Sequence, residues 1–207
     1  MKIHVHKGDL PDGIQWGNTL AVDTEAAGLN IHRDRLCVVQ LTDGGGDVHL
    51  VQIAPGQKQA KRLTHLLQNP DQLKLFHFGR FDIALLYVTF GVLTRPVYCT
   101  KIASWLCRTY TSYHGLKDLC HEFLGVQLSK QQQCSDWGRE KLSEEQAKYA
   151  AEDVIHLHKL WHALDDRLKR EGRLELVRAC HEFLPNRALL DVEGWEDFDI
   201  FAHSARA

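Results

Sequence analysis

The chain has 207 residues, of which 44% are apolar and 25% charged, the size and composition of one large globular domain. No apolar run approaches the roughly 20 residues that span a bilayer, and the first residues lack the basic start and apolar core of a signal peptide. We therefore expect a cytoplasmic protein with no membrane partner. With 25 Lys and Arg against 27 Asp and Glu, the composition argues against a basic surface for long duplexes or structured RNA. It allows a local basic site or a very short nucleic-acid substrate.

The cysteines and histidines give no metal-binding motif in the sequence. Six cysteines are scattered without a CxxC pair, which indicates reduced, buried thiols rather than a zinc ribbon or a disulfide framework. Thirteen histidines occur, but none forms an HxxxH or HExxH arrangement with a third ligand in view. We interpret most of them as surface or packing residues.

The predicted elements begin with strands and continue with alternating helices and strands. In chain order they are strands at Thr19–Glu25, Arg35–Thr42 and Asp47–Gln52, a helix at Lys58–Gln68, a strand at Leu73–His77, a helix at Arg80–Phe90, a strand at Val97–Cys99, and helices at Lys101–Tyr110 and Leu116–Leu124. Gly44-Gly45-Gly46 is interpreted as a hairpin turn, because a phosphate-binding loop would continue with a lysine and Ser or Thr. Ser143 and Gln146 form a capping-box pattern that opens a long helix reaching to Leu168. This order predicts an α/β fold with a mixed sheet flanked by helices.

Two carboxylates end the first predicted strand. Asp23 and Glu25 are two residues apart in Leu20-Ala21-Val22-Asp23-Thr24-Glu25, so their side chains point to the same face of the strand. Neighbouring carboxylates repel each other and raise each other's pKa unless a cation lies between them. Mg²⁺ binds such carboxylates together with phosphate oxygens and water. By itself the pattern also fits a strand end with two solvated acids.

Further acids are expected on two helices. Asp82 follows the apolar stretch that ends in Phe78, in the first turn of a helix, where an acid also interacts favourably with the helix dipole. Tyr149 and Asp153 are four residues apart and therefore share one face of the long helix. Each motif alone also fits an ordinary exposed acid, and their order along predicted elements makes the stronger case.

Together these acids predict a two-metal site. Two Mg²⁺ or Mn²⁺ ions, about 3.5–4 Å apart, clamp a scissile phosphate and activate water. We expect Asp23 to bridge the two ions, Glu25 and Asp153 to bind the water-activating ion, and Asp82 to bind the second ion, directly or through water. Tyr149 is expected to orient the attacking water, because a free tyrosine, with a pKa near 10, is a poor base.

The ordered set Asp-x-Glu, Asp, Tyr-x-x-x-Asp resembles the three motifs of the DEDD exonuclease superfamily, in the tyrosine-bearing subgroup that includes RNase D. Supporting segments are similar to that subgroup along nearly the whole chain: Arg35–Leu41, His114–Leu119 and Ser129–Trp137. The resemblance implies an RNase H-like (DnaQ-like exonuclease) fold, a mixed sheet of five to six strands flanked by helices. It also implies 3′–5′ exonuclease activity with divalent cations.

The chain departs from RNase D in a way that points to a smaller relative. RNase D carries C-terminal helical domains that bind nucleic acid, and this sequence ends at Ala207 without them. Its length and the segments Phe76–Asp82, Lys130–Trp137 and Gly194–Ser204 resemble the bacterial nanoRNase C family. That resemblance implies an octameric ring that degrades very short RNA, dinucleotides above all, with short DNA left open as a second substrate. We expect residues 1–190 to form the exonuclease domain.

The resemblance also implies a set of substrate contacts. Leu29 is expected to be a wedge between the two terminal bases, although it also fits an ordinary core leucine. Residues near the second acid are expected to stack on a base or meet a phosphate: His77, Phe78, Arg80 and Phe81. A later polar group is expected to meet the phosphate at the 5′ end: Lys130, Gln133, Ser135 and Arg139. Each of these residues also fits an ordinary surface or core position.

Two alternatives remain open at this point. One is a broader RNase D-like exonuclease that trims tRNA 3′ ends or degrades longer RNA or DNA, which needs a long basic track. The other is a non-catalytic nucleic-acid-binding protein on the same fold, which the presence of every acid disfavours. The tail, residues 191–207, contains Trp195, Phe198 and Phe201 and is expected to pack on its own domain or on a neighbouring subunit.

Overall fold

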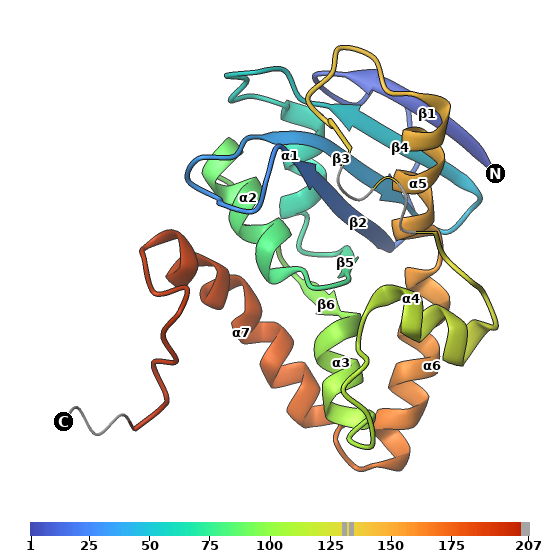
Figure 1. The fold of residues 1–207 in the computed structure, drawn as a ribbon, viewed down its shortest axis with the longest axis vertical. Coiled ribbons are helices and arrows are strands. Elements are labelled where there is room, and N and C mark those ends of the chain that lie inside the picture. Colours follow the sequence, from blue (N-terminus) through green and yellow to red (C-terminus); the bar gives the residue numbers. More distant parts are fainter. Residues whose placement is uncertain (130–131, 133–134, 204–207) are drawn as a thin grey trace.

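A mixed sheet runs through the protein, with helices on both of its faces (Figure 1). The computed structural model describes residues 1–129, 132 and 135–203. Its six strands are β1 (Lys2–Lys7), β2 (Thr19–Ala26), β3 (Leu36–Thr42), β4 (Asp47–Gln52), β5 (Leu73–Phe76) and β6 (Val97–Cys99). They lie in the order β1-β4-β3-β2-β5-β6, with β3 antiparallel to β2 and β4 and the other pairs parallel. The mixed sheet flanked by helices is therefore confirmed.

The central strand β3 shows why the sheet has two covered faces. All seven of its residues are buried, as expected for a strand that reads as a continuous apolar run with helices on both sides. Leu20 and Val22 of β2 pack with α1 (Lys61–Gln68), α2 (Arg80–Phe90) and the C-terminal half of α7 (Leu174–Val192). Ala21, between them, packs on the opposite face with α5 (Glu144–Ile155) and α6 (Leu157–Arg170). Alternate residues of β2 therefore face opposite helical layers.

The remaining helices connect β6 to α5. They are α3 (Thr100–Cys107) and α4 (Leu116–Leu119), and α4 continues into one π-helical turn over Cys120–Leu124. Gly125 ends that turn in a left-handed conformation, with φ of 66°, and the helix stop predicted at this glycine is therefore found. No helix within the described part of the chain combines the length and apolar character needed to cross a membrane.

The structure differs from the sequence predictions at three places. Strand β1 was not predicted, because only Ile3 and Val5 interrupt its polar residues, yet it pairs in parallel with β4 at the edge of the sheet. The predicted long helix is divided at His156 into α5 and α6. Helix α7 was also missed, and it contains Pro185 in its interior, a residue that sequence patterns count against a helix.

Candidate active site

Strand β2 carries the first pair of acids at its end. Asp23 lies opposite Gln40 of β3 and Glu25 lies opposite Val38, before an irregularity in the pairing at Glu25 and Ala26. Both acids share the face of Ala21, which packs against α5. The side chains of Asp23 and Glu25 are therefore presented to α5, as the spacing predicts.

Helix α5 brings a third acid to this pair. Asp23, Glu25 and Asp153 each offer one carboxylate oxygen, and these oxygens all lie within 4.8 Å of one another. The start of α5 is fixed by the predicted capping box, in which the Gln146 backbone N–H donates to Ser143 Oγ at 3.1 Å. The Ser143 backbone N–H donates in return to Gln146 Oε1 at 3.0 Å. Tyr149, one turn before Asp153 on this helix, has its ring centre 6.0 Å from that of Trp137.

The fourth acid comes from the other helical layer. Asp82 lies in the first turn of α2 and is 4% exposed. Its Oδ1 accepts a hydrogen bond of 2.6 Å from Thr24 Oγ1, between the two acids of β2. The charge of Asp82 raises the pKa of Asp23, Glu25 and Asp153, so the structure brings all four acids into one electrostatic cluster.

The electrostatics of this cluster fit a site for divalent cations. Burial is the main cause that raises the pKa of each acid, to about 9 for Glu25 and about 7 for Asp82 and Asp153. Burial, together with Asp82, Asp153 and Glu25, also raises the pKa of Asp23 well above its usual range. Four carboxylates this close cannot all be charged near neutral pH without a cation. Hard oxygen donors are the ligands of Mg²⁺, so the donor set fits this metal.

A pocket lined by the chain neighbours of Asp82 contains most of one group of predicted substrate contacts. It has a volume of about 530 Å³ and is lined by Leu29, Phe78, Arg80 and Phe81 together with residues of the chain end. Leu29 is 89% exposed, so it is not a core leucine. Phe78 is 43% exposed and has φ of 65°, a left-handed conformation that is rare for an aromatic residue and typical of strained functional positions.

The side chains of Arg80 and His77 both form hydrogen bonds to other residues of the protein. Arg80 Nε and Nη2 donate to the two carboxylate oxygens of Asp191 at 2.5 and 2.6 Å, and Nη2 also donates to the Glu196 carbonyl oxygen. Arg80 therefore holds the chain end on the pocket. His77 Nδ1 is 2.9 Å from Thr100 Oγ1, and burial together with Lys101 lowers its pKa to about 3. His77 is thus neutral near pH 7.

Ser135 and Arg139, the two members of the later polar group that the structure describes, do not line that pocket. Ser135 Oγ accepts a hydrogen bond of 2.9 Å from Gln146 Nε2 and so supports the start of α5. Arg139 is exposed and lines a different pocket beside Lys7, Arg35 and Gln52. Lys130 and Gln133 lie outside the described residues.

Three residues near the site were missed by sequence reasoning. Thr24 holds Asp82, and its position between two acids on a strand predicts that it faces α2. Gln40 is fully buried beside Asp23, and neither of its amide atoms has a hydrogen-bond partner in the described chain. The sequence could have indicated Gln40, because it is the one amide side chain in the otherwise apolar stretch Leu36–Leu41. Lys101 Nζ lies 4.2 Å from the centre of the Phe78 ring, a contact that the sequence does not predict.

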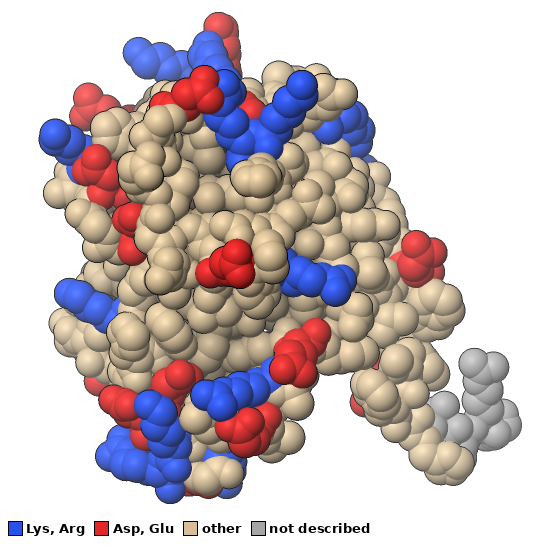
Figure 2. Space-filling model, turned by 180° about the vertical axis from the view of Figure 1, so that it is seen from behind, with Lys and Arg blue, Asp and Glu red and all other residues tan. Residues whose placement is uncertain are grey.

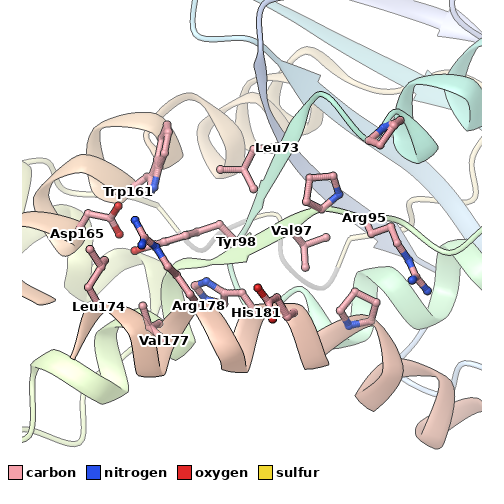
Figure 3. Close-up of a pocket in the computed structure, with 14 residues that line it drawn as sticks. Leu73, Arg95, Val97, Tyr98, Trp161, Asp165, Leu174, Val177, Arg178 and His181 are labelled. Atoms are coloured by element: carbon pink, nitrogen blue, oxygen red, sulfur yellow. The ribbon is translucent and has the colours of Figure 1, made fainter.

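A larger pocket lies elsewhere on the molecule. It has a volume of about 660 Å³ and is lined from β6, α6 and α7 by residues that include Tyr98, Trp161 and His181 (Figure 3). None of the predicted site residues lines it, so volume alone does not locate the active site. Seen from behind, Lys and Arg interleave with Asp and Glu, and this face shows no continuous basic track (Figure 2).

Comparison with known proteins identifies the family and the fold. A family model described as 3′–5′ exonuclease matches residues 11–169. Ribonuclease D of Granulibacter bethesdensis is 34% identical over 159 residues, which cover 76% of this chain and 40% of that protein. The chain thus spans about 40% of the length of such curated relatives.

Solved structures confirm the predicted exonuclease fold. Brucella melitensis NrnC bound to pGG shares 52% identity and a TM-score of 0.94, covering 99% of this chain and all 100% of that one. NrnC of the same organism with bound Mg²⁺ shares 51% identity at a TM-score of 0.94, with coverage of 99% and 100%. Escherichia coli RNase D shares 26% identity at a TM-score of 0.74, covering 87% of this chain and 48% of that one.

Proposed function

Because this chain belongs to the 3′–5′ exonuclease family, we propose that it hydrolyses very short RNA, dinucleotides above all, from the 3′ end to nucleoside monophosphates. The observation that carries this proposal is the pocket at the start of α2, next to Asp82 in the chain, which has an acidic wall formed by the C-terminal segment. Asp191, Glu196 and Asp197 line that pocket, and its cations Arg33 and Arg80 are already paired with Asp34 and Asp191. A long nucleic acid has many phosphates to neutralise, so it gains little binding energy from such an acidic surface.

The acids are proposed to hold two divalent cations, Mg²⁺ or Mn²⁺. In this proposal Asp23, Glu25 and Asp153 would hold one cation, and Asp82 with Asp23 would hold the other, directly or through water. When bound, the cations neutralise the scissile phosphate and lower the pKa of the attacking water. The Tyr149 hydroxyl orients that water by hydrogen bonding, from the same face of α5 as Asp153. The hydrogen bond from Thr24 keeps the Asp82 carboxylate turned toward the cluster.

The pocket is proposed to bind the two nucleotides. Leu29, which is 89% exposed, enters between the bases, and Phe78 offers an exposed ring for stacking. Lys101 lies against that ring and supplies a positive charge for the phosphate next to the scissile bond. The pGG-bound structure of the Brucella protein supports a two-nucleotide occupant of this size. Arg80 and Phe81 form part of the pocket wall rather than carry the reaction. His77 precedes Phe78 and is held by Thr100.

The assembly and location are part of the same proposal. We propose a homo-octameric ring in the bacterial cytoplasm, which rests on the family resemblance and on bacterial relatives. In such a ring Lys130, Gln133, Ser135 and Arg139 are proposed to meet the 5′ phosphate of a bound substrate. Light scattering coupled to size exclusion measures the subunit number, and a monomer or dimer at micromolar concentration contradicts the ring.

The experiment is a length series of 5′-labelled RNAs, from two to seven nucleotides plus a tRNA, in Mg²⁺, Mn²⁺ or EDTA. We expect the dinucleotide to be cleaved fastest, with no cleavage in EDTA. Equal rates on two-mers and seven-mers contradict the dinucleotide preference, and rapid trimming of tRNA favours the broader RNase D-like activity. Asp23→Asn is expected to abolish cleavage, whereas Asp71→Asn, an exposed acid elsewhere, is the matched control. Leu29→Ala is expected to reduce the preference for dinucleotides over longer RNA.

A further inference from the structure

Three histidines gather on the two strands at the far edge of the sheet. His4 and His6 of β1 are two residues apart and point to the same face, and His4 lies directly opposite His49 of β4. His49 shares its strand face with Val51, which packs in the layer of α1 and α2. Asp23 and Glu25 face α5 on the other side of the sheet, and β3 and β4 separate β1 from β2. This cluster is therefore separate from the acids.

Two of the imidazoles are aimed at each other. His6 Nε2 and His49 Nδ1 are 2.9 Å apart and share a hydrogen bond, and their ring planes differ by only 12°. One nitrogen donates a proton along this line and the other offers its lone pair. Both nitrogens thus point at the space between them, where a cation can take the place of the shared proton. Two nitrogens bound to one tetrahedral Zn²⁺, at about 2.0–2.1 Å each, lie only a little farther apart than this pair.

His4 has the setting of a third ligand. Its ring centre is 4.9 Å from that of His49, and its Nε2 lies 3.1 Å from Asp47 Oδ2. Metal-binding histidines commonly donate one ring N–H to a carboxylate, which leaves the other nitrogen available as the ligand. In this structure the His4 ring stacks on the His49 ring, and its nitrogens do not point to the space between His6 Nε2 and His49 Nδ1. Its side chain is 40% exposed, so its ring has room to turn.

The imidazole nitrogens of this cluster favour a different class of metal ion from the one that the carboxylates of the active site favour. Burial lowers the pKa of both His6 and His49, and the neighbouring imidazoles lower it further, while Asp47 and Asp43 oppose the effect at His49. Trp16 also lies against the His49 ring, with the two ring centres 5.1 Å apart. Neutral imidazole is a ligand for Zn²⁺, Ni²⁺ and Cu²⁺, whereas Mg²⁺ prefers oxygen.

We propose that His6 and His49, with His4 as a third imidazole once its ring turns, bind one Zn²⁺-class cation that fastens β1 to β4. Strand β1 pairs only with β4 in the described sheet, so a cation shared between the two strands adds a side-chain link to the backbone pairing of this edge. This inference is independent of the proposed exonuclease activity, because it concerns another face, another metal class and a binding measurement.

The test is a titration of the full-length protein with Zn²⁺, against a chromophoric chelator and in excess Mg²⁺. We expect one Zn²⁺ per chain whose affinity falls by more than about tenfold in His6→Gln and in His49→Gln. His65→Gln, an exposed histidine on α1, is the matched control and is expected to bind like the unchanged protein. Any Zn²⁺ that enters the acid cluster is common to every variant and cancels in the comparison. Equal stoichiometry and affinity in the His6 and His49 variants overturn the proposal.

A spectroscopic measurement covers the case in which a variant fails to fold. Cu²⁺ bound to the unchanged protein is expected to show hyperfine coupling to two or three imidazole nitrogens in electron paramagnetic resonance. A purely oxygen-ligand spectrum also overturns the proposal. Zn²⁺ is further expected to raise the unfolding temperature of the unchanged protein and of His65→Gln, and not that of His49→Gln. Retained dinucleotide hydrolysis in Mg²⁺ shows that a variant is folded.

Discussion

Asp153→Asn is expected to stabilise the protein when no metal is present, although it removes a proposed catalytic group. The pKa of Asp153 is raised from its ordinary 3.8 to about 7, first by burial and then by Glu152 and Asp82. The folded state therefore binds this proton more tightly than the unfolded state, and the carboxyl makes folding less favourable as pH rises from about 4 through about 7. The difference between a pKa of 3.8 and one of about 7 corresponds to about 4 kcal/mol.

We assign about half of this energy to the substitution, because burial is the main cause of the raised pKa and the polar amide of Asn also loses solvent at this buried position. A gain of about 2 kcal/mol raises the unfolding temperature of a chain of this size by about 4–8 °C. Thermal unfolding in EDTA at pH 8 measures it, with Asp71→Asn as the control. At pH 4 most of the gain is expected to vanish, since the carboxyl is then protonated in the folded state and close to half protonated in the unfolded state. In Mg²⁺ the order is expected to reverse, because the unchanged protein gains a bound ion and the variant loses a ligand.

An unfolding temperature for Asp153→Asn that is equal to or below that of the unchanged protein in EDTA at pH 8 refutes this reasoning. The same holds for a gain that persists unchanged at pH 4, because it then does not arise from the charge of Asp153. In either case the acids are not the repelling cluster that requires a cation. The two-metal proposal then loses its electrostatic support, whatever the activity of the variant.

Other substitutions test the neighbours of the acids. Thr24→Val removes a buried hydrogen bond of 2.6 Å to Asp82, so we expect a loss of about 1–3 kcal/mol in urea unfolding and weaker activation by Mg²⁺. Gln40→Met removes two buried amide atoms without partners, so we expect higher stability by about 1 kcal/mol in the same assay; an unchanged or lower stability shows that these atoms are satisfied in solution. Lys101→Met keeps contact with the Phe78 ring but removes the charge, and we expect a higher KM for dinucleotides with unchanged stability. A KM equal to that of the unchanged protein contradicts a phosphate contact.

Local rules were sufficient to place the acids on their elements. Alternation along a strand puts Asp23 and Glu25 on one face, and helical spacing puts Tyr149 and Asp153 on another. The capping box at Ser143 fixed the start of α5, and the structure contains both of its hydrogen bonds. The prediction that these elements meet depended on the order of the motifs, and the mutual approach of the carboxylates within 4.8 Å could be known only from the fold.

Long-range pairs account for most of what the sequence did not reveal. From its place in the sequence, Arg80 was predicted to contact a phosphate. In the structure it pairs with Asp191, which is 111 residues away and lies in a helix that was not predicted. The positive φ of Phe78 is likewise set by the turn between β5 and α2, because no local preference of phenylalanine favours it. The histidine cluster escaped notice for the same reason, since β1 carries too few apolar residues to be recognised before its pairing with β4 is known.

The alternation of strand β2 explains how one short motif serves two helical layers. Asp23 and Glu25 face α5, which brings Asp153, while Thr24 between them faces α2 and binds Asp82. A slip of one residue in the pairing of β2 with β3 would turn both acids toward α2 and Thr24 toward α5, and so dismantle the cluster. Leu20, Ala21 and Val22 are fully buried between the two layers, and they make that slip unfavourable. The apolar residues before the acids are therefore as necessary to the metal site as the acids themselves, because they fix the face on which each carboxylate lies.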